Sequence, residues 1–339
     1  MSEQRIFKVP KFCRPNSLAA FSMELSEAPE CKKVIIDTGL ERFLTPTALI
    51  FIAKVCRERR RRYPEERVLY RGLKEHKYAN NLGFSEALNI KDKPYPQGAF
   101  GGRTYIPISV MQRDSLEAYA AENWVELGDA IQVKCENLAR VVSQDRSDAL
   151  RKLLADSFRE IFRNVFEHGE VNTAVFCVQY WAKPDKVEIC IADRGVGVCN
   201  SLNTSKHTKP SSDREALYFS LMPGVSSKAW RNKKKKAHQK SDWDNSGYGL
   251  FFAHQLFGEL GHFFLASGSA GLLLMGKTVR DVDCSLEGTL VSMSIDLSDE
   301  KKIKNVLSKI HGEAHRVKQK LGVKSVSFQS VEAYLNGKL

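Results

Sequence analysis

Strand-like and helix-like patterns alternate through the first hundred residues. Residues 32–39, KKVIIDTG, form a β-branched run that ends in a carboxylate and a glycine, which is typical of a buried strand. Residues 45–62 begin with Thr45 and Pro46 and continue with apolar positions at helical spacing, so they predict an N-capped amphipathic helix. A second strand, RVLYRGL, and a short helix that ends near Gly83 are expected next. This order predicts an α/β domain over residues 1–110.

A loop rich in glycine, proline and aromatic residues, at positions 93–109, marks the expected end of this domain. Residues 111–299 are expected to form a second domain, and residues 300–339 a basic helical tail. The second domain starts with helical segments that are broken near residues 143–148. The helix that leads to His168 carries an apolar stripe at helical spacing, made by Leu154, Phe158, Ile161, Phe162 and Val165.

Polar side chains border this stripe at a four-residue step. Glu160, Asn164 and His168 each lie about 40° around the helix from the one before, which places them at the rim of a pocket. The amide oxygen of Asn164 would coordinate Mg²⁺, and the carboxylate of Glu160 would accept a proton from attacking water or from a substrate hydroxyl. Taken alone, this short motif, EIFRN at residues 160–164, would favour a polar helix edge that faces water.

A second short motif favours the pocket rim over a helix edge that faces water. The run KVEICIADRGVGV predicts a strand that ends at Asp193 and is followed by Gly195 and Gly197. An acid at a strand end can accept a hydrogen bond from the amino group of adenine. Glycines let the backbone approach the base without a clash from a β-carbon. The box therefore predicts the adenine end of a nucleotide pocket.

Two further boxes supply contacts for the phosphates and the base. Residues 200–245 are polar and rich in serine and lysine, and we expect them to form a lid that Lys228 helps to order over the phosphates. The next helix has N-terminal amides suited to phosphate oxygens, and it opens with Gly247, Tyr248, Gly249 and Leu250. The hydroxyl of Thr289, on a later strand, would complete the hydrogen bonds around Asp193.

Taken in order, the boxes EIFRN, DRGVG, SGYGL and EGT make residues 160–297 similar to the GHKL superfamily of ATPases. That superfamily includes gyrase, the large heat-shock chaperone, histidine kinases and mismatch-repair enzymes. The resemblance implies an α/β sandwich with a mixed, largely antiparallel sheet and helices on one face, and ATP with Mg²⁺ as ligands. It places functional residues at Asn164, Asp193, Gly195, Gly197, Gly247, Gly249 and Thr289.

The N-terminal segment resembles a different family, the STAS-like α/β fold of anti-sigma-factor antagonists. The runs VIIDTGLERFLTPTALIFIA and YANNLGF carry this resemblance, between residues 32 and 88. Thr47 occupies the position of a phosphorylatable Ser or Thr in those antagonists. Thr45, Pro46 and Ala48 replace the usual neighbours, so a role at the start of the helix is favoured for Thr47 over phosphorylation.

Composition and cysteine usage indicate a globular, cytoplasmic protein. The chain has 339 residues, of which 42% are hydrophobic, and contains no apolar run near the roughly 20 residues that a membrane span needs. Its start, MSEQRIFKVP, lacks the apolar core of a signal peptide. The 8 cysteines contain no C-x-x-C pair, and several lie in strand-like runs. They are expected to be buried thiols in a reducing compartment, not zinc ligands or disulfides.

The net charge of +12 is concentrated in a few segments, namely residues 57–62 (RERRRR), residues 231–236 (RNKKKK) and the C-terminal tail. Such runs can attract nucleic acid or acidic protein surfaces. No recognised nucleic-acid module accompanies them, so a solvated helix end and a mobile loop are the favoured interpretations of the two compact runs.

The resemblance leaves two functional classes. No histidine lies between His76 and His168, so the phosphoacceptor helix of a histidine kinase is missing upstream of the boxes. The segment after Leu297 is too short for the extra domains of gyrase, mismatch-repair enzymes or the heat-shock chaperone. We expect a Mg²⁺-dependent ATPase or Ser/Thr protein kinase that acts as a regulatory switch, with a protein partner or as a homo-oligomer. The alternative is a non-catalytic ATP-gated interaction or sensor module, for example in bacterial defence or signalling.

Overall fold

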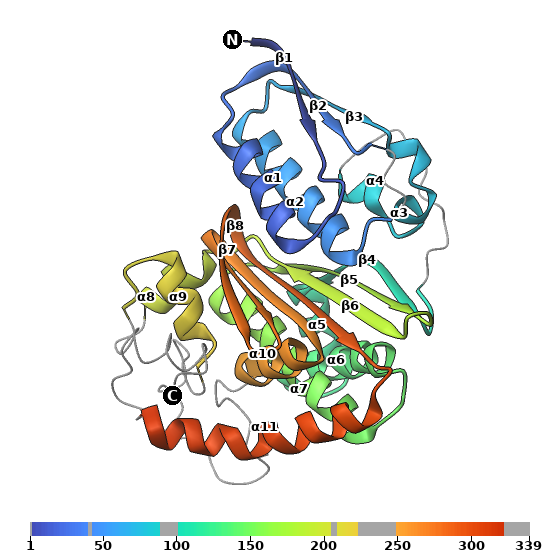
Figure 1. Ribbon diagram of the computed structural model, residues 1–339, viewed down its shortest axis with the longest axis vertical. Coiled ribbons are helices and arrows are strands. Elements are labelled where there is room, and N and C mark those ends of the chain that lie inside the picture. The colour runs from blue at the N-terminus through green and yellow to red at the C-terminus, as the bar shows by residue number, and fades with distance from the viewer. Residues whose placement is uncertain (1, 40–42, 89–100, 205–208, 223–248, 322–339) are drawn as a thin grey trace.

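The computed structural model describes residues 2–39, 43–88, 101–204, 209–222 and 249–321. Over these residues the chain has a mixed α/β fold with a three-stranded sheet near the N-terminus and a five-stranded sheet after it. Figure 1 shows the N-terminal sheet and its helices on one side of the five-stranded sheet and a group of helices on the other. We call the described residues up to Leu88 the N-terminal layer.

The N-terminal sheet is parallel, in the order β1-β2-β3. Its strands are β1 (Ser2–Lys8), β2 (Cys31–Asp37) and β3 (Arg67–Arg71). Helices α1 (Pro15–Glu27) and α2 (Pro46–Arg62) make the crossovers that parallel strands require. The two strands and the helix expected here are confirmed. Thr45 caps α2, because its hydroxyl accepts a hydrogen bond from the backbone amide of Ala48 at 3.4 Å.

The segment expected as one short helix is divided. A 3₁₀ turn, η1 (Leu73–Glu75), leads into two short helices, α3 (Lys77–Asn81) and α4 (Phe84–Ala87). Gly83 separates α3 from α4 with a φ of +98°, a left-handed conformation that glycine adopts without steric cost.

The five-stranded sheet has the order β4-β5-β6-β8-β7, and every neighbouring pair is antiparallel. Its strands are β4 (Tyr105–Gln112), β5 (Thr173–Trp181), β6 (Lys186–Ala192), β7 (Gly261–Met275) and β8 (Thr278–Asp296). The largely antiparallel character that the resemblance implies is confirmed, but the described strands of this sheet include no parallel pair, so over these residues the sheet is not mixed. β4 also crosses residue 110, where the sequence places the end of the first domain.

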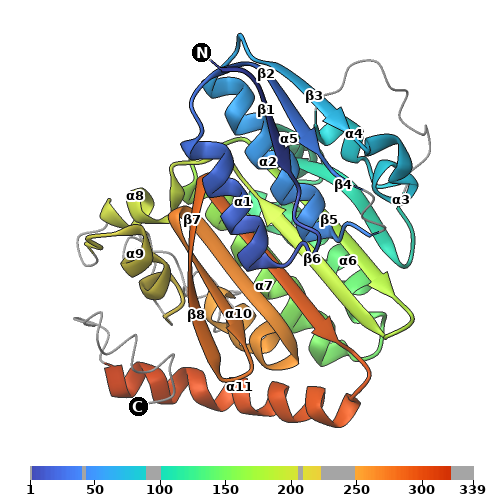
Figure 2. The same ribbon diagram turned by 45° about the horizontal axis from the view of Figure 1, so that its top comes forward.

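One face of this sheet is covered by helices, as Figures 1 and 2 show. They are α5 (Arg113–Glu122), α6 (Leu127–Ser143), α7 (Asp148–His168) and α10 (Gly249–Leu260), with α11 (Glu300–Leu321) along their outer side. α8 (Gly197–Asn203) and α9 (Asp213–Ser220) lie beside β7. The predicted break between α6 and α7 is confirmed. The apolar stripe of α7 is buried, with Leu154, Phe158 and Phe162 each 0% exposed.

The N-terminal layer covers the opposite face of the five-stranded sheet through α1 and α2. Buried side chains of both parts form one hydrophobic core, to which the sheet contributes Cys177, Cys190, Phe264 and Leu290. The sheet therefore has helices on both faces, and its residues are held between two packed layers.

Thr47 lies in the interface between these layers and is only 2% exposed. Its backbone amide and its hydroxyl both donate to Oε1 of Glu188, at 3.1 and 2.5 Å, and its Oγ1 is 2.5 Å from Oγ of Ser292. A carboxylate beside the first turn of a helix stabilises that end of the helix. Thr47 thus anchors the start of α2 to the sheet, and its hydroxyl is enclosed in this arrangement.

The first basic run, residues 57–62, forms the C-terminal end of α2. The expectation that this run is a solvated helix end is wrong for Arg59. This residue is 4% exposed and pairs with Glu66, with Nη2 2.5 Å from Oε1. It also donates to the carbonyl oxygens of Leu25 and Ala28 at 2.6 and 2.9 Å. These contacts tie the end of α2 to the end of α1. The second run, at 231–236, lies outside the described residues.

Six of the 8 cysteines are buried, Cys13 and Cys199 being the exceptions, so the expectation of buried thiols is confirmed for those six. Burial raises the pKa of the Cys56 thiol to about 12, which keeps it protonated and unreactive. In the part of the chain that the structure describes, no helix combines the length and apolar character needed to cross a membrane.

Candidate functional site

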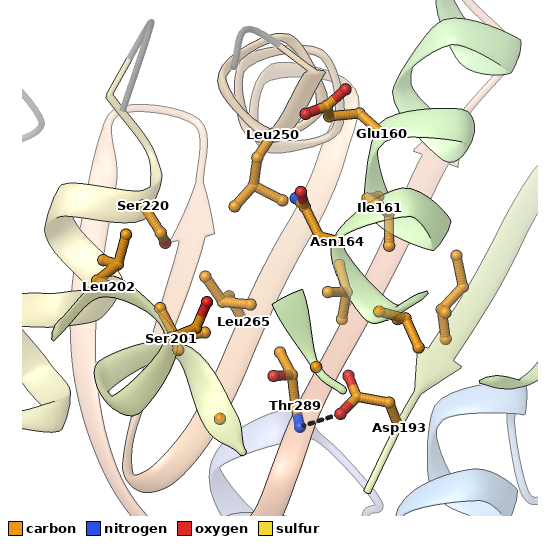
Figure 3. Close-up of a pocket in the computed structure, with 16 residues that line it drawn as sticks. Glu160, Ile161, Asn164, Asp193, Ser201, Leu202, Ser220, Leu250, Leu265 and Thr289 are labelled. Atoms are coloured by element: carbon orange, nitrogen blue, oxygen red, sulfur yellow. Dashed lines mark hydrogen bonds between the residues drawn. The ribbon is translucent and has the colours of Figure 1, made fainter. Parts of the chain in front are cut away.

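A pocket lies between the helices and the five-stranded sheet, where α7, α8, α9 and α10 meet β6, β7 and β8 (Figure 3). It holds about 850 Å³ of empty space, open solvent at the mouth included. Most of the lining is aliphatic, from Ile161, Val165, Ile191, Val198, Leu202, Leu250, Leu265 and Val291.

Asp193 and Thr289 lie at one end of this pocket. Asp193 follows β6 and is 6% exposed, and its Oδ1 accepts hydrogen bonds from the backbone amides of Gly195 at 2.7 Å and Thr289 at 3.3 Å. Burial raises the pKa of Asp193, while these hydrogen bonds and the charge of Lys54 act in the opposite direction. Figure 3 shows the other carboxylate oxygen directed toward the pocket. The Thr289 hydroxyl was expected beside Asp193, and the hydrogen bond that joins the two residues comes from the Thr289 backbone amide.

Glu160 and Asn164 lie toward the opposite end, one helical turn apart on α7, and both line the pocket. The Glu160 side chain is 17% exposed, and its Oε2 lies 3.4 Å from Nη1 of Arg163. Arg163 also pairs with Glu167, with Nε 3.0 Å from Oε1. The pocket thus has a buried carboxylate at one end and a carboxylate with an amide at the other, separated by aliphatic walls.

Two glycines of the boxes, Gly195 and Gly249, lie where a β-carbon would overlap a neighbouring residue. A β-carbon on Gly195 would lie 2.3 Å from the backbone oxygen of Gly169, and one on Gly249 would lie 2.2 Å from Cβ of Glu160. Because they carry no side chain, Gly195 can lie against Gly169 and Gly249 can lie against Glu160, and both contacted residues line the pocket. Gly197 lines the pocket itself and has a φ of +80°.

Several predicted residues cannot be placed against this pocket. Lys228, Gly247 and Tyr248 lie outside the described residues. The predicted lid, at 200–245, is described only over 200–204 and 209–222, where it forms the end of α8 and then α9. Leu250, at the start of α10, is described and lines the pocket.

Ser267 and Gly288 complete the end of the pocket that holds Asp193, although the sequence analysis does not single them out. The Ser267 hydroxyl donates to the carbonyl oxygen of Gly288 at 2.7 Å and accepts from the backbone amide of Val198 at 3.0 Å. These bonds join β7, β8 and α8. Gly288 lies inside the EGT box, which was a usable signal, whereas nothing in the pattern around Ser267 distinguishes it from other strand serines.

Replacing Gly288 by Ala should damage this end of the pocket. Its φ is +69°, and a β-carbon would lie 2.6 Å from the backbone oxygen of Asp193 and 2.7 Å from Oδ1. We expect Gly288→Ala to lower the free energy of unfolding by about 3 kcal/mol, from backbone strain and overlap together. Gly276→Ala is the matched control, because φ is +58° there and nothing lies within 4 Å, so only the strain of about 1 kcal/mol remains. Denaturant unfolding of both variants measures the difference, and equal losses would contradict the described packing.

The polar residues fit Mg²⁺ that arrives with a nucleotide better than a metal centre made by protein side chains. No group of three or more His, Cys, Asp or Glu side chains suited to a metal ion occurs within the described ranges. Mg²⁺ bound with phosphates needs only one or two protein ligands, since phosphate oxygens and waters fill its other positions. Asn164 and Glu160 present two oxygen-bearing side chains at the same end of the pocket.

Comparison of the chain with models of protein families, with curated proteins and with solved structures finds no significant match.

Proposed function

We propose that the chain binds ATP with Mg²⁺ in this pocket and acts as an ATPase or Ser/Thr protein kinase with a regulatory role. The observation that carries the proposal is the buried carboxylate of Asp193 at one end of a largely aliphatic pocket. Burying a carboxylate is costly unless it is hydrogen-bonded, and both backbone amides that donate to it do so at Oδ1. Oδ2 is then the oxygen that would accept a hydrogen bond from the adenine amino group.

The aliphatic walls next to Asp193 suit a flat apolar ring. Ile191 and Val291 come from neighbouring strands, and Leu265 comes from β7 on the far side of β8. These side chains are paired directly across the sheet, so an adenine ring lying over them would lose water from the face that contacts them. Each square ångström of apolar surface so buried contributes roughly 25 cal/mol. Shape and apolar contact would supply affinity, and Asp193 with Thr289 would supply selectivity for adenine.

The phosphates would extend toward Glu160 and Asn164. Mg²⁺ would be held by the phosphates and the amide oxygen of Asn164, and it would neutralise charge there. Glu160 would take a proton from water or from a protein hydroxyl as that oxygen forms a bond to the terminal phosphorus and the bond to the ADP oxygen breaks. Its position beside the start of α10 also places it near helix amides that favour anions.

A second candidate function is an ATP-gated interaction module in which turnover has no role. It is favoured by the contact between the N-terminal layer and the pocket: Nζ of Lys54, on α2, donates to the backbone oxygen of Asp193 at 2.6 Å. Through such a contact the state of the pocket could change the surface that the N-terminal layer presents to a partner.

Incubation of the purified protein with ATP labelled on the terminal phosphate separates these functions. Free labelled phosphate identifies hydrolysis, label on the chain or on an added protein identifies a kinase, and intact labelled ATP retained by the protein identifies a gated module. Labelled GTP is the matched control, because guanine carries an acceptor oxygen where adenine carries its amino group. Protein that neither retains nor converts labelled ATP would overturn the proposal.

A further inference from the structure

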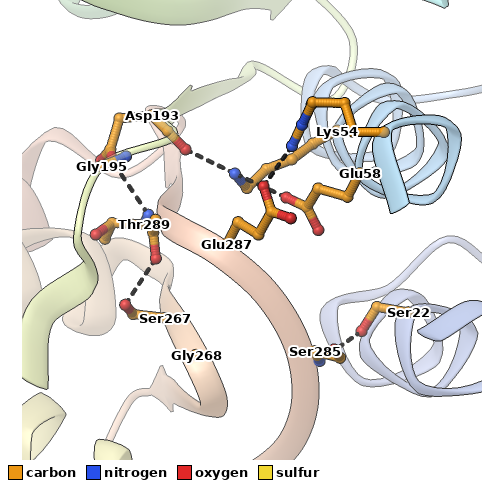
Figure 4. A network of polar contacts seen from close by, with 12 residues as sticks. Ser22, Lys54, Glu58, Asp193, Gly195, Ser267, Gly268, Ser285, Glu287 and Thr289 are labelled. Atoms are coloured by element: carbon orange, nitrogen blue, oxygen red, sulfur yellow. Dashed lines mark hydrogen bonds and ion pairs between the residues drawn. The ribbon is translucent and has the colours of Figure 1, made fainter. Parts of the chain in front are cut away.

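One face of α2 contacts both chain segments that build the Asp193 end of the pocket. Lys54, Glu58 and Arg61 lie on successive turns of the helix. Figure 4 shows Lys54 and Glu58 facing the segments around Asp193 and Glu287, and Arg61 pairs with Glu287. Glu287 immediately precedes Gly288 and Thr289 in the chain. None of the three α2 side chains lines the pocket, so they act on it only through the protein.

Lys54 is the central contact of this face. Its Nζ donates to the backbone oxygen of Asp193 at 2.6 Å and lies 3.0 Å from Oε1 of Glu58. The side chains of this pair are only 6% and 10% exposed. Burial raises the pKa of Glu58, and the charge of Lys54 partly offsets that effect. A buried ion pair is weak evidence for stability, because removing two charges from water costs about as much as their attraction returns. The pair is better explained by the position it gives to Asp193.

The second segment is held by the end of α2. Arg61 forms an ion pair with Glu287, whose side chain is 48% exposed. Thr289, two residues further on, donates its backbone amide to Oδ1 of Asp193 at 3.3 Å, and its backbone oxygen accepts from the amide of Asp193 at 2.9 Å. Both halves of the hydrogen-bonded unit formed by Asp193 and Thr289 are therefore attached to α2.

We infer that the N-terminal layer sets the affinity of the pocket for nucleotide, with Lys54 as the residue that positions Asp193. The inference rests on the proposed function and adds the regulation of the same site. Fixing the Asp193 backbone fixes the direction of its carboxylate, so a ligand that bonds to this carboxylate binds best when α2 is docked. By linkage, a bound nucleotide would strengthen the docking of α2 by the same factor. Any partner that loosens the N-terminal layer would thereby release nucleotide.

The decisive variant replaces both members of the ion pair, as Lys54→Met with Glu58→Met. It removes the donor to the Asp193 backbone oxygen and leaves no buried charge unpaired, and such replacements are often neutral for stability. Tyr78→Phe is the matched control, because it removes a hydrogen bond across the same interface, from the Tyr78 hydroxyl to Oε1 of Gln179 at 3.1 Å, without touching the pocket.

Two quantities are measured in each protein. The first is the Kd for ATP with Mg²⁺, by calorimetry. The second is the hydrogen exchange of the Gly195 and Thr289 amides without nucleotide, because both amides donate to Asp193. We expect the double variant to bind ATP about tenfold more weakly, as for the loss of one hydrogen bond, and to exchange both amides faster. Tyr78→Phe should match the wild type in both measurements.

Unchanged affinity and exchange in the double variant would overturn the inference, and so would changes of the same size in Tyr78→Phe. Failure of the proposed function is distinguishable from failure of this inference. A wild-type protein that binds no ATP contradicts the proposed function, whereas the exchange measured without nucleotide decides by itself whether the Lys54–Glu58 pair positions Asp193 and Thr289.

Discussion

Replacing Glu160 by Ala should reduce the release of phosphate from ATP, or its transfer to a protein, by about 10² to 10⁴, the usual contribution of a general base. Affinity for ATP should change little, because Glu160 lies at the pocket end away from Asp193 and Thr289. Glu160→Gln is the sharper variant, since it keeps the side-chain carbons that pack against Gly249 and removes only the basic oxygen. Steady-state turnover and a binding titration together give both quantities.

Glu167→Ala is the matched control for these variants. Glu167 pairs with Arg163 as Glu160 does, but it does not line the pocket. Loss of its ion pair should leave turnover near the wild-type rate. Wild-type turnover in Glu160→Gln would place the base elsewhere, and an equal loss in Glu167→Ala would assign the effect to Arg163 instead of to proton transfer.

Replacing Asp193 by Ala should weaken ATP binding by about 1.5 to 3 kcal/mol, the usual worth of a hydrogen bond to a charged group. This corresponds to a Kd raised about 10-fold to 150-fold. The loss arises because the adenine amino group would lose its charged acceptor at this end of the pocket. Calorimetric titration with ATP and Mg²⁺ measures it, after a thermal unfolding scan has shown that the variant is folded.

Glu188→Gln controls for the loss of a buried carboxylate from the same strand. Glu188 is 5% exposed, lies on β6 and bonds to Thr47, away from the pocket. Its replacement should leave the Kd for ATP unchanged. An Asp193→Ala protein that is folded and binds ATP as tightly as the wild type would remove Asp193 from the site.

Local structure could be predicted where it is determined by residues close together in the chain. The β-branched run of β2, the Thr45 cap of α2 and the apolar stripe of α7 each act through neighbours in the chain, and each is confirmed. The meeting of Asp193 with Thr289 was also predictable, although 96 positions separate them, because both belong to boxes with a recognisable order.

Long-range arrangement was less accessible from the sequence. The strand order β4-β5-β6-β8-β7 places β8 beside β6, although β7 lies between them in the chain. The apolar pattern of a strand indicates which face is buried but not which strand lies beside it. The position of the N-terminal layer depends on contacts such as Thr47 with Glu188, which lie 141 residues apart. Lys54 gave no signal, since a single lysine in an apolar helix is indistinguishable by pattern from one that reaches solvent.

The position of a bound ATP analogue tests the central claim most directly. Crystals grown with a non-hydrolysable analogue and Mg²⁺ should show the adenine amino group within hydrogen-bond distance of the Asp193 carboxylate, with the ring lying against the side chains of Ile191 and Val291. The terminal phosphates should point toward Asn164 and Glu160. An analogue bound elsewhere on the protein, or bound in this pocket with its phosphates at Asp193, would contradict the account.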